Sequence, residues 1–204
     1  MKHSSDASGG VSRETLARLE TYAALLLQWN RTINLISRKD EAVLWERHIV
    51  DSLALLPVLP QDFSHAIDLG SGGGLPGIVL AICTGKPFHL VESDQRKCAF
   101  LREAARALDV RVTVHTARIE AVQLPVAPLI TARALAPLTT LLGWSHRLLA
   151  PDGVCVFPKG RSVDEELTAA ASEWHMTVQS VPSPTDHAAR ILRISEIERV
   201  GHAT

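Results

Sequence analysis

The sequence predicts an α/β fold, with a doubly wound, mostly parallel sheet, a closing antiparallel hairpin and a helical N-terminal extension. Three observations lead to this expectation. From residue 61 onward, short β-branched runs alternate with helical patterns, which is typical of successive βαβ units. The last two strand-like runs have no helical pattern between them, so they should pair antiparallel. The first 60 residues contain only helical patterns.

Three parts of the chain are expected in order: a flexible tail at 1–11, a helical extension at 12–60 and a ligand-binding domain at 61–204. The tail is small and polar and lacks the apolar core of a signal peptide. In the extension, apolar side chains three and four residues apart, from Leu16 to Trp29, predict an amphipathic helix capped by Ser12. A second helix is expected from about Asp40 to Leu56, ended by Pro57.

The remaining elements follow the same reasoning. The parallel strands should span 66–69, 88–92, 110–115, 128–131 and 154–157. Helices should span 75–84, 95–108, 137–149 and 164–174. The closing antiparallel strands should span 176–181 and 189–197. Parallel strands end at one edge of a sheet, and ligands of such sheets bind there.

Composition excludes several classes of protein. The net charge of −1 argues against a uniformly basic nucleic-acid coat protein, although local basic patches remain allowed. The three cysteines form no C-x-x-C pair, so neither a disulfide framework nor a zinc site is expected, and a reducing cytoplasm suits them. The nine histidines lack metal-ligand spacing, so no metal is expected. No apolar run reaches the ~18 residues of a membrane span.

The most informative segment is the glycine-rich loop from Asp68 to Gly77, which contains five glycines after a strand-like run. Glycine allows positive φ and close approach of a ligand to the backbone, and the following helix N-terminus favours a polar ligand. Two registers are possible. Gly72, Gly74 and Gly77 satisfy the G-x-G-x-x-G pattern of dinucleotide sites. Asp68-x-Gly70-x-Gly72 instead resembles the loop of S-adenosylmethionine (SAM) methyltransferases, which usually have an acidic residue at that position.

Both registers give Glu92 a role, because it ends the next predicted strand about 20 residues after the loop, where a carboxylate can accept hydrogen bonds from ribose hydroxyls. The atom that accepts the methyl group can be narrowed down, because two motifs of other methyltransferases are missing. The fourth strand is followed by Thr131-Ala-Arg-Ala134 rather than the Asn-Pro-Pro-Tyr motif typical of adenine-amine methylation. The cysteines lie within predicted strands and helices, which disfavours a pyrimidine-C5 nucleophile. Transfer to an already nucleophilic atom remains, and it needs alignment more than a base.

Six motifs occur in one order: Asn34–Ser37, His48–Ser52, Asp68–Gly77, Arg96-Lys97 with Phe100-Leu101, Thr131–Ala134 and Lys159-Gly160. Together they resemble the bacterial 16S ribosomal RNA guanine-N7 methyltransferase family, also called glucose-inhibited division protein B, from about residue 15 to 197. That family methylates N7 of a guanine in the 530 loop. The chain departs at Ile36, where the family usually has threonine.

The resemblance implies a class I SAM-dependent methyltransferase fold and a set of site residues. Those implied at the cofactor are Gly70, Ser71, Gly72, Leu75, Glu92, Ile119, Glu120 and Arg133. Arg133 is also the expected catalytic residue, because it follows the fourth strand at the carboxyl edge of the sheet. Candidates for RNA contact are His48, Asp51, Lys97, Lys159 and Arg161. His48 and Asp51 are expected one turn apart on a helix, so they could contact the ligand or could equally serve only to pack the extension on the sheet.

The implied partner is 16S ribosomal RNA within a small subunit or an assembly intermediate, with no membrane and no obligate protein partner. Aromatic residues make up only 4% of the chain, which disfavours a stacking platform for single strands. Three alternatives remain open at this point: a small-molecule methyltransferase, a dinucleotide-dependent oxidoreductase and a non-enzymatic SAM or nucleotide sensor.

Overall fold

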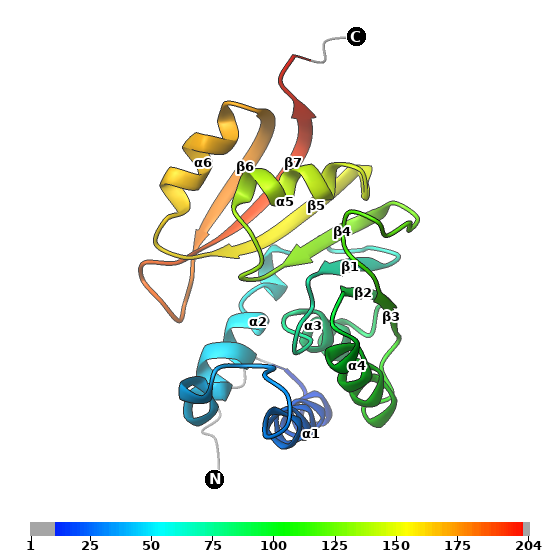
Figure 1. Ribbon diagram of the computed structural model, residues 1–204. Coiled ribbons are helices and arrows are strands. Elements are labelled where there is room, and N and C mark those ends of the chain that lie inside the picture. Colours follow the sequence, from blue (N-terminus) through cyan, green and yellow to red (C-terminus); the bar gives the residue numbers. More distant parts are fainter. Residues whose placement is uncertain (1–10, 202–204) are drawn as a thin grey trace.

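The computed structural model describes residues 11–201, which form a seven-stranded sheet in the order β3-β2-β1-β4-β5-β7-β6 (Figure 1). In that order the strands are Val112–Thr116, Phe88–Glu92, Ala66–Leu69, Ala127–Ala132, Leu149–Lys159, Arg190–Arg199 and Trp174–Pro182. The first five strands along the chain pair in parallel. β7 is antiparallel to both β5 and β6, as the sequence predicted. The expected fold class is confirmed.

Helices cover both faces of the sheet (Figure 1). On one face lie α1 (Arg13–Asn30), α3 (Gly77–Thr84) and α4 (Gln95–Ala107), which share a hydrophobic core with the sheet. On the other face α5 (Leu138–His146) and α6 (Val163–Ala171) build a second core. Within residues 11–201, no helix combines the length and the apolar character needed to cross a membrane.

The N-terminal extension is part of the first core rather than a separate unit. α1 begins where predicted, because Ser12 caps it by accepting a hydrogen bond from the N–H of Thr15. Its apolar stripe buries Leu19 and Leu26 against the sheet side. The predicted tail at 1–11 lies, except for residue 11, outside the described residues.

The prediction of a second, continuous α-helix in the extension was wrong. The chain instead forms a 3₁₀ turn at Arg38–Val43, a π turn at Trp45–Val50, the short α2 at Asp51–Leu53 and a 3₁₀ turn at Leu56–Val58. The buried positions explain the π turn, because 44, 48 and 52 and then 45, 49 and 53 recur every four residues. That spacing is wider than 3.6 residues, and an i→i+5 turn keeps such positions on one face.

Several boundaries after residue 137 also differ from the prediction. The fifth strand was expected only at 154–157, but β5 begins at Leu149 and α5 ends three residues before it. The strand bulges at this point, because Ala127 pairs with Leu149 and Leu129 with Val154. The sixth helix ends at 171 rather than 174, and β6 and β7 are longer than predicted.

The order of the strands determines where a ligand can bind. β1 lies between β2 and β4, so the chain leaves β1 toward one side of the sheet and leaves β4 toward the other. The loops after these two strands therefore diverge and open a crevice at their carboxyl ends. The glycine-rich loop follows β1 and Arg133 follows β4 directly, so both border this crevice.

Candidate functional site

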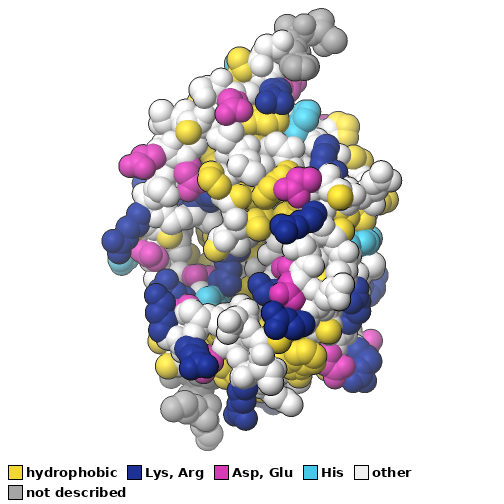
Figure 2. All heavy atoms as spheres, in the orientation of Figure 1, with side chains coloured by type: hydrophobic (Ala, Val, Ile, Leu, Met, Phe, Trp, Pro, Cys, Tyr) yellow, Lys and Arg dark blue, Asp and Glu magenta, His cyan; other side chains and the backbone are white. Residues whose placement is uncertain are grey.

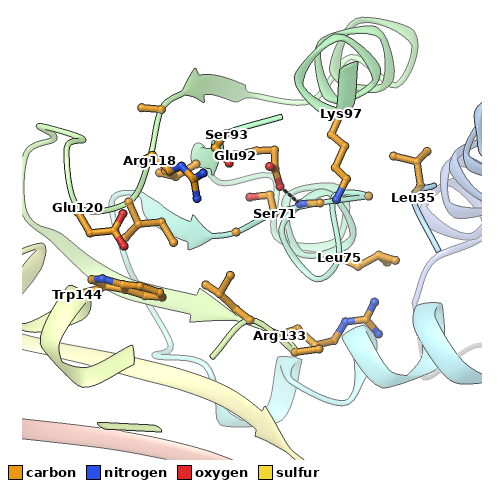
Figure 3. Close-up of a pocket in the computed structure, with 18 residues that line it drawn as sticks. Leu35, Ser71, Leu75, Glu92, Ser93, Lys97, Arg118, Glu120, Arg133 and Trp144 are labelled. Carbon is orange, nitrogen blue, oxygen red and sulfur yellow. Dashed lines mark hydrogen bonds between the residues drawn. The ribbon is translucent and has the colours of Figure 1, made fainter. Parts of the chain in front are cut away.

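A cavity of about 420 Å³ lies at this carboxyl edge and is within the size range of small-ligand sites (Figure 3). Its lining comes from the carboxyl ends of β1, β2, β3 and β4 and the loops that follow them, together with one side chain each from the extension, α4 and α5. All of the residues that the sequence assigned to a cofactor line this cavity: Gly70, Ser71, Gly72, Leu75, Glu92, Ile119, Glu120 and Arg133.

The backbone of the glycine-rich loop forms one wall of the cavity. Gly70 and Gly72 have φ of +63° and +55°, which side-chain-bearing residues rarely adopt. A Cβ atom at Gly70 would lie 2.4 Å from Cδ1 of Leu135, so a side chain there would collide with the opposite wall. The bare backbone at this position leaves a cradle that a ligand can approach closely.

The helical extension holds this loop in place. The buried hydroxyl of Tyr22 on α1 donates a hydrogen bond to the carbonyl oxygen of Gly73. Burial raises the pKa of Tyr22, so the phenol stays protonated and keeps donating. Leu26 and Leu35 lie within van der Waals distance of a Cβ position on Gly73. The extension therefore supports the cofactor-side wall from behind, and Leu35 also lines the cavity.

Asp68, the acidic residue that distinguished the two registers, does not line the cavity but lies fully buried beneath the loop. The hydroxyl of Thr131 donates to its Oδ1 over 2.7 Å, which ties β4 to β1. The Oγ of Ser71 donates to its backbone carbonyl over 3.0 Å. Burial raises the pKa of the Asp68 carboxyl to about 6. Its structural role is to brace the loop.

Glu92 is fixed at the end of β2 by two backbone hydrogen bonds. The N–H of Gly72 donates to Oε2 over 2.9 Å (Figure 3), and the N–H of Asp94 donates to Oε1 over 2.8 Å. Each carboxylate oxygen has a second lone pair, so both can still accept from a ligand hydroxyl. The carboxylate is thus aimed at the cavity before any ligand binds.

The far end of the cavity is a slot with apolar sides. Ile119, which is buried after β3, and Trp144 of α5 both line it. Glu120 is exposed beside Trp144 at this end of the cavity (Figure 3). A flat aromatic ring would be buried against these apolar side chains, and the nearby carboxylate can accept from its amino group. An adenine fits this slot.

Arg133 lies at the opposite end of the cavity from this slot (Figure 3). Its Nη1 donates to Nδ1 of His48 over 2.9 Å. Burial and the guanidinium lower the pKa of His48 to about 4, so the imidazole is neutral and accepts this hydrogen bond at Nδ1. No ion pair of Arg133 occurs between described residues, which is unlike a surface arginine paired with a carboxylate. Its other nitrogens remain available to a ligand anion.

A second cavity of about 1020 Å³ begins where the first one ends. The two cavities share one wall, made of Arg133, Ala134 and Leu135. His48, Asp51 and Lys159 line the second cavity, so three of the five residues assigned to RNA lie together there. Lys97 instead lines the first cavity, and Arg161 is exposed but lines neither.

Lys159 is largely buried, with 9% of its side chain exposed, and its ammonium group already has protein partners. It forms an ion pair with Glu166 at 2.5 Å and donates to the carbonyl oxygen of Ala136 over 3.0 Å. Glu166 also accepts from the N–H of Leu138 over 2.8 Å. These contacts hold the segment that follows the shared wall, so Lys159 is a positioning residue in this structure.

The sequence analysis missed several lining residues. Trp144 had a readable signal, because Leu138, Leu141 and Leu142 form the buried stripe of α5 and Trp144 lies off that stripe. Leu35 and the 183–191 segment of the β6–β7 hairpin had no such signal, since only the folded chain brings them to the cavities. Within residues 11–201, no group of histidine, cysteine or acidic side chains is arranged to hold a metal ion.

The first cavity fits SAM at three places. Glu92 offers two acceptors for a ribose diol, the Ile119–Trp144 slot fits an adenine, and Arg133 offers free guanidinium nitrogens to a carboxylate at the other end. The glycine backbone between them leaves room for the linking atoms. The described residues are consistent with this cofactor along the whole length of the cavity.

Comparison with known proteins agrees with this geometry. The family model "GidB: rRNA small subunit methyltransferase G" matches residues 15–191. The ribosomal RNA small subunit methyltransferase G of Granulibacter bethesdensis is 58% identical, over 95% of this chain and 91% of its own. The protein of that name from Gluconobacter oxydans is 56% identical, over 93% and 98%. A SAM-dependent methyltransferase structure from Aquifex aeolicus shares the fold, with a TM-score of 0.59 at 14% identity over 77% of this chain and 94% of that chain. The chain belongs to the GidB family of rRNA small subunit methyltransferases.

Proposed function

We propose that the protein transfers a methyl group from SAM to N7 of a guanine in the 530 loop of 16S ribosomal RNA. One observation carries the proposal: the cavity that fits SAM and the larger, open cavity share the wall Arg133–Leu135. A nucleobase in the larger cavity and a cofactor in the smaller one would therefore meet at that wall. Family membership supports ribosomal RNA as the substrate class.

The site needs no general base for this reaction. SAM supplies a methyl group on a positively charged sulfur. Guanine N7 carries an in-plane lone pair and no proton, so nothing has to be removed from it before or after the transfer. The residues at the wall agree, because His48 is neutral but its Nδ1 is already occupied by Arg133. The contribution of the protein is alignment and charge placement.

Arg133 is the proposed catalytic residue. A guanidinium beside a sulfonium is repulsive unless an anion lies between them, and the cofactor carboxylate or an RNA phosphate would serve. The planar guanidinium can bind an oxyanion through two parallel hydrogen bonds and stays charged at any working pH. His48 orients the guanidinium by accepting a hydrogen bond from Nη1. Arg133 would thus align the cofactor and the target guanine with each other.

The surface around the cavities suits a structured RNA. Figure 2 shows Lys and Arg side chains gathered over the lower half of this face, beside a hollow in the middle of the molecule. The extension contributes exposed cations, namely Arg31, Arg38, Lys39 and Arg47. Lys97 and Arg161 would extend this basic surface past the cavity mouths. Phosphate contacts of this kind would position a small subunit or an assembly intermediate. A ribosomal substrate would have the protein act in the cytoplasm.

A labelling experiment tests the proposal. Tritiated SAM is incubated with the protein and with small ribosomal subunits from a strain that lacks the modification, and naked 16S RNA is assayed in parallel. Label in the RNA of one of these substrates is expected with the natural chain and lost with Glu92→Ala, which removes the ribose acceptors. Absence of label in every RNA would overturn the proposal.

A further inference from the structure

The larger cavity has a lining of mixed charge. Five carboxylates line it, namely Asp40, Glu46, Asp51, Glu166 and Asp186, beside four cationic side chains, Arg47, Arg133, Lys159 and Arg190. A phosphate offers only acceptors, whereas a base carries both N–H donors and ring acceptors. A lining that offers acceptors and donors together therefore suits a single base that has left its stack.

Among these five carboxylates, Asp51 is in the best position to accept from a ligand. Both oxygens of Asp40 and both oxygens of Glu166 already have polar partners in neighbouring side chains. Glu46 and Asp186 are exposed at the rim. Asp51 is half-buried, and within residues 11–201 only one of its oxygens accepts a hydrogen bond.

That one hydrogen bond fixes the carboxylate across the cavity. Asp51 begins α2 in the extension, and Oδ1 accepts from the hydroxyl of Thr185 in the β6–β7 hairpin, 134 residues away. Oδ2 is left for a ligand, and Oδ1 keeps a second lone pair, so the carboxylate can accept from two donors. Burial lowers the pKa of Arg133, and Asp51 is one of the nearby groups that oppose this shift, so its charge acts on the shared wall. A base held by Asp51 would therefore lie between that carboxylate and Arg133.

We propose that the larger cavity receives the target guanine turned out of the RNA, and that Asp51 accepts hydrogen bonds from its N1–H and N2 amino groups. The inference rests on the proposed function. Guanine suits this pair of walls, because its N–H donors and its N7 lie on opposite edges of the base. With the donors on Asp51, N7 faces the shared wall. Adenine also has an N7, but its N1 is an acceptor that the carboxylate repels.

The test compares guanosine with inosine, which lacks only the N2 amino group, at the target position of reconstituted small subunits. Single-turnover methylation and equilibrium binding of the subunits without SAM are measured for the natural chain, Asp51→Asn and Thr185→Val. Asp152→Asn is the matched control, because Asp152 is exposed and lines neither cavity. Melting curves and SAM calorimetry establish that each variant is folded and binds cofactor.

The natural chain is expected to methylate the inosine subunit about 10-fold more slowly than the guanosine subunit, the scale of one lost base contact. Asp51→Asn should be roughly 10- to 100-fold slower on guanosine and nearly insensitive to inosine, with unchanged SAM affinity. Thr185→Val removes the hydroxyl that holds the Asp51 carboxylate, so its methylation rate should lie between those of the natural chain and Asp51→Asn. This variant replaces Asp51→Asn in the test if Asp51→Asn does not fold. Equal sensitivity of Asp51→Asn and the natural chain to inosine would overturn the inference. If the natural chain methylates neither subunit, the proposed function itself is wrong.

Discussion

Replacing Glu92 by glutamine should weaken SAM binding by roughly 10- to 100-fold without unfolding the protein. The two oxygens of Glu92 accept from the N–H groups of Gly72 and Asp94, at 2.9 and 2.8 Å. Both partners are donors, so an amide NH₂ at either position replaces an acceptor with a donor. One hydrogen bond within the loop is lost, and so is one to the ribose.

Only the bond to the ribose enters the binding free energy directly, because the loop bond is lost from the free protein and from the complex alike. A hydrogen bond to a charged group contributes about 1.5–3 kcal/mol. Since each 1.4 kcal/mol is tenfold in affinity, the dissociation constant should rise by roughly 10- to 100-fold. Glu92→Ala removes both ribose acceptors and should raise it by roughly 10²- to 10⁴-fold.

Titration calorimetry of SAM into the natural chain and the variant measures this change directly. Glu103→Gln is the matched control, because Glu103 lies on α4 with its carboxylate paired to Arg106, away from the cavity. Thermal melts exclude unfolding as the cause. An unchanged SAM affinity in a folded Glu92→Gln protein would refute the assignment of this carboxylate to the ribose.

Three further predictions follow from the same geometry. Gly70→Val should abolish SAM binding, because its side chain would meet Leu135 within 2.4 Å at a φ of +63°; calorimetry showing normal binding would contradict the cradle. Arg133→Lys should melt normally yet transfer methyl at least ~10-fold more slowly in single turnovers, since it loses the bidentate fork, with Arg133→Ala slower still; a natural rate for the alanine variant would rule out the role. Asp68 has a pKa raised from 3.8 to about 6, so its contribution to stability is fully present below pH 4 and declines as the pH rises to 6. Asp68→Asn removes this decline, so urea denaturation should show the free energy of unfolding of the variant rising by up to roughly 3 kcal/mol relative to that of the natural chain between pH 4 and 7. A difference between the two proteins that does not change with pH would exclude the raised pKa of Asp68.

Much of the fold was predictable because local patterns determine it. The strand–helix alternation, the Ser12 cap and the two final strands without a helix between them each depend on neighbouring residues, and all three are present in the structure. The glycine-rich loop and Glu92 were also readable, because a nucleoside-binding loop requires glycine at fixed positions and an acid at a fixed offset. The π turn at Trp45–Val50 was not predicted, because its four-residue spacing is close to that of an α-helix.

The site was less predictable wherever it depends on distant segments. Asp51 and Thr185 are 134 residues apart, and only the closing hairpin brings them together. Lys159 was assigned to RNA from its position after the fifth strand, but its ammonium group is paired with Glu166 in a nearly buried contact. A sequence gives the order of such residues along the chain, while burial and pairing depend on the packing of whole elements.

Identification of the modified base tests the central claim most directly. Small ribosomal subunits lacking the modification are treated with the protein and SAM, and the RNA is digested to nucleosides and mapped by mass spectrometry. The proposed function, with SAM and the target base meeting at the wall Arg133–Leu135, predicts 7-methylguanosine at a single guanine of the 530 loop. A methyl group on another base, on another atom of guanine, or at many positions would contradict the account.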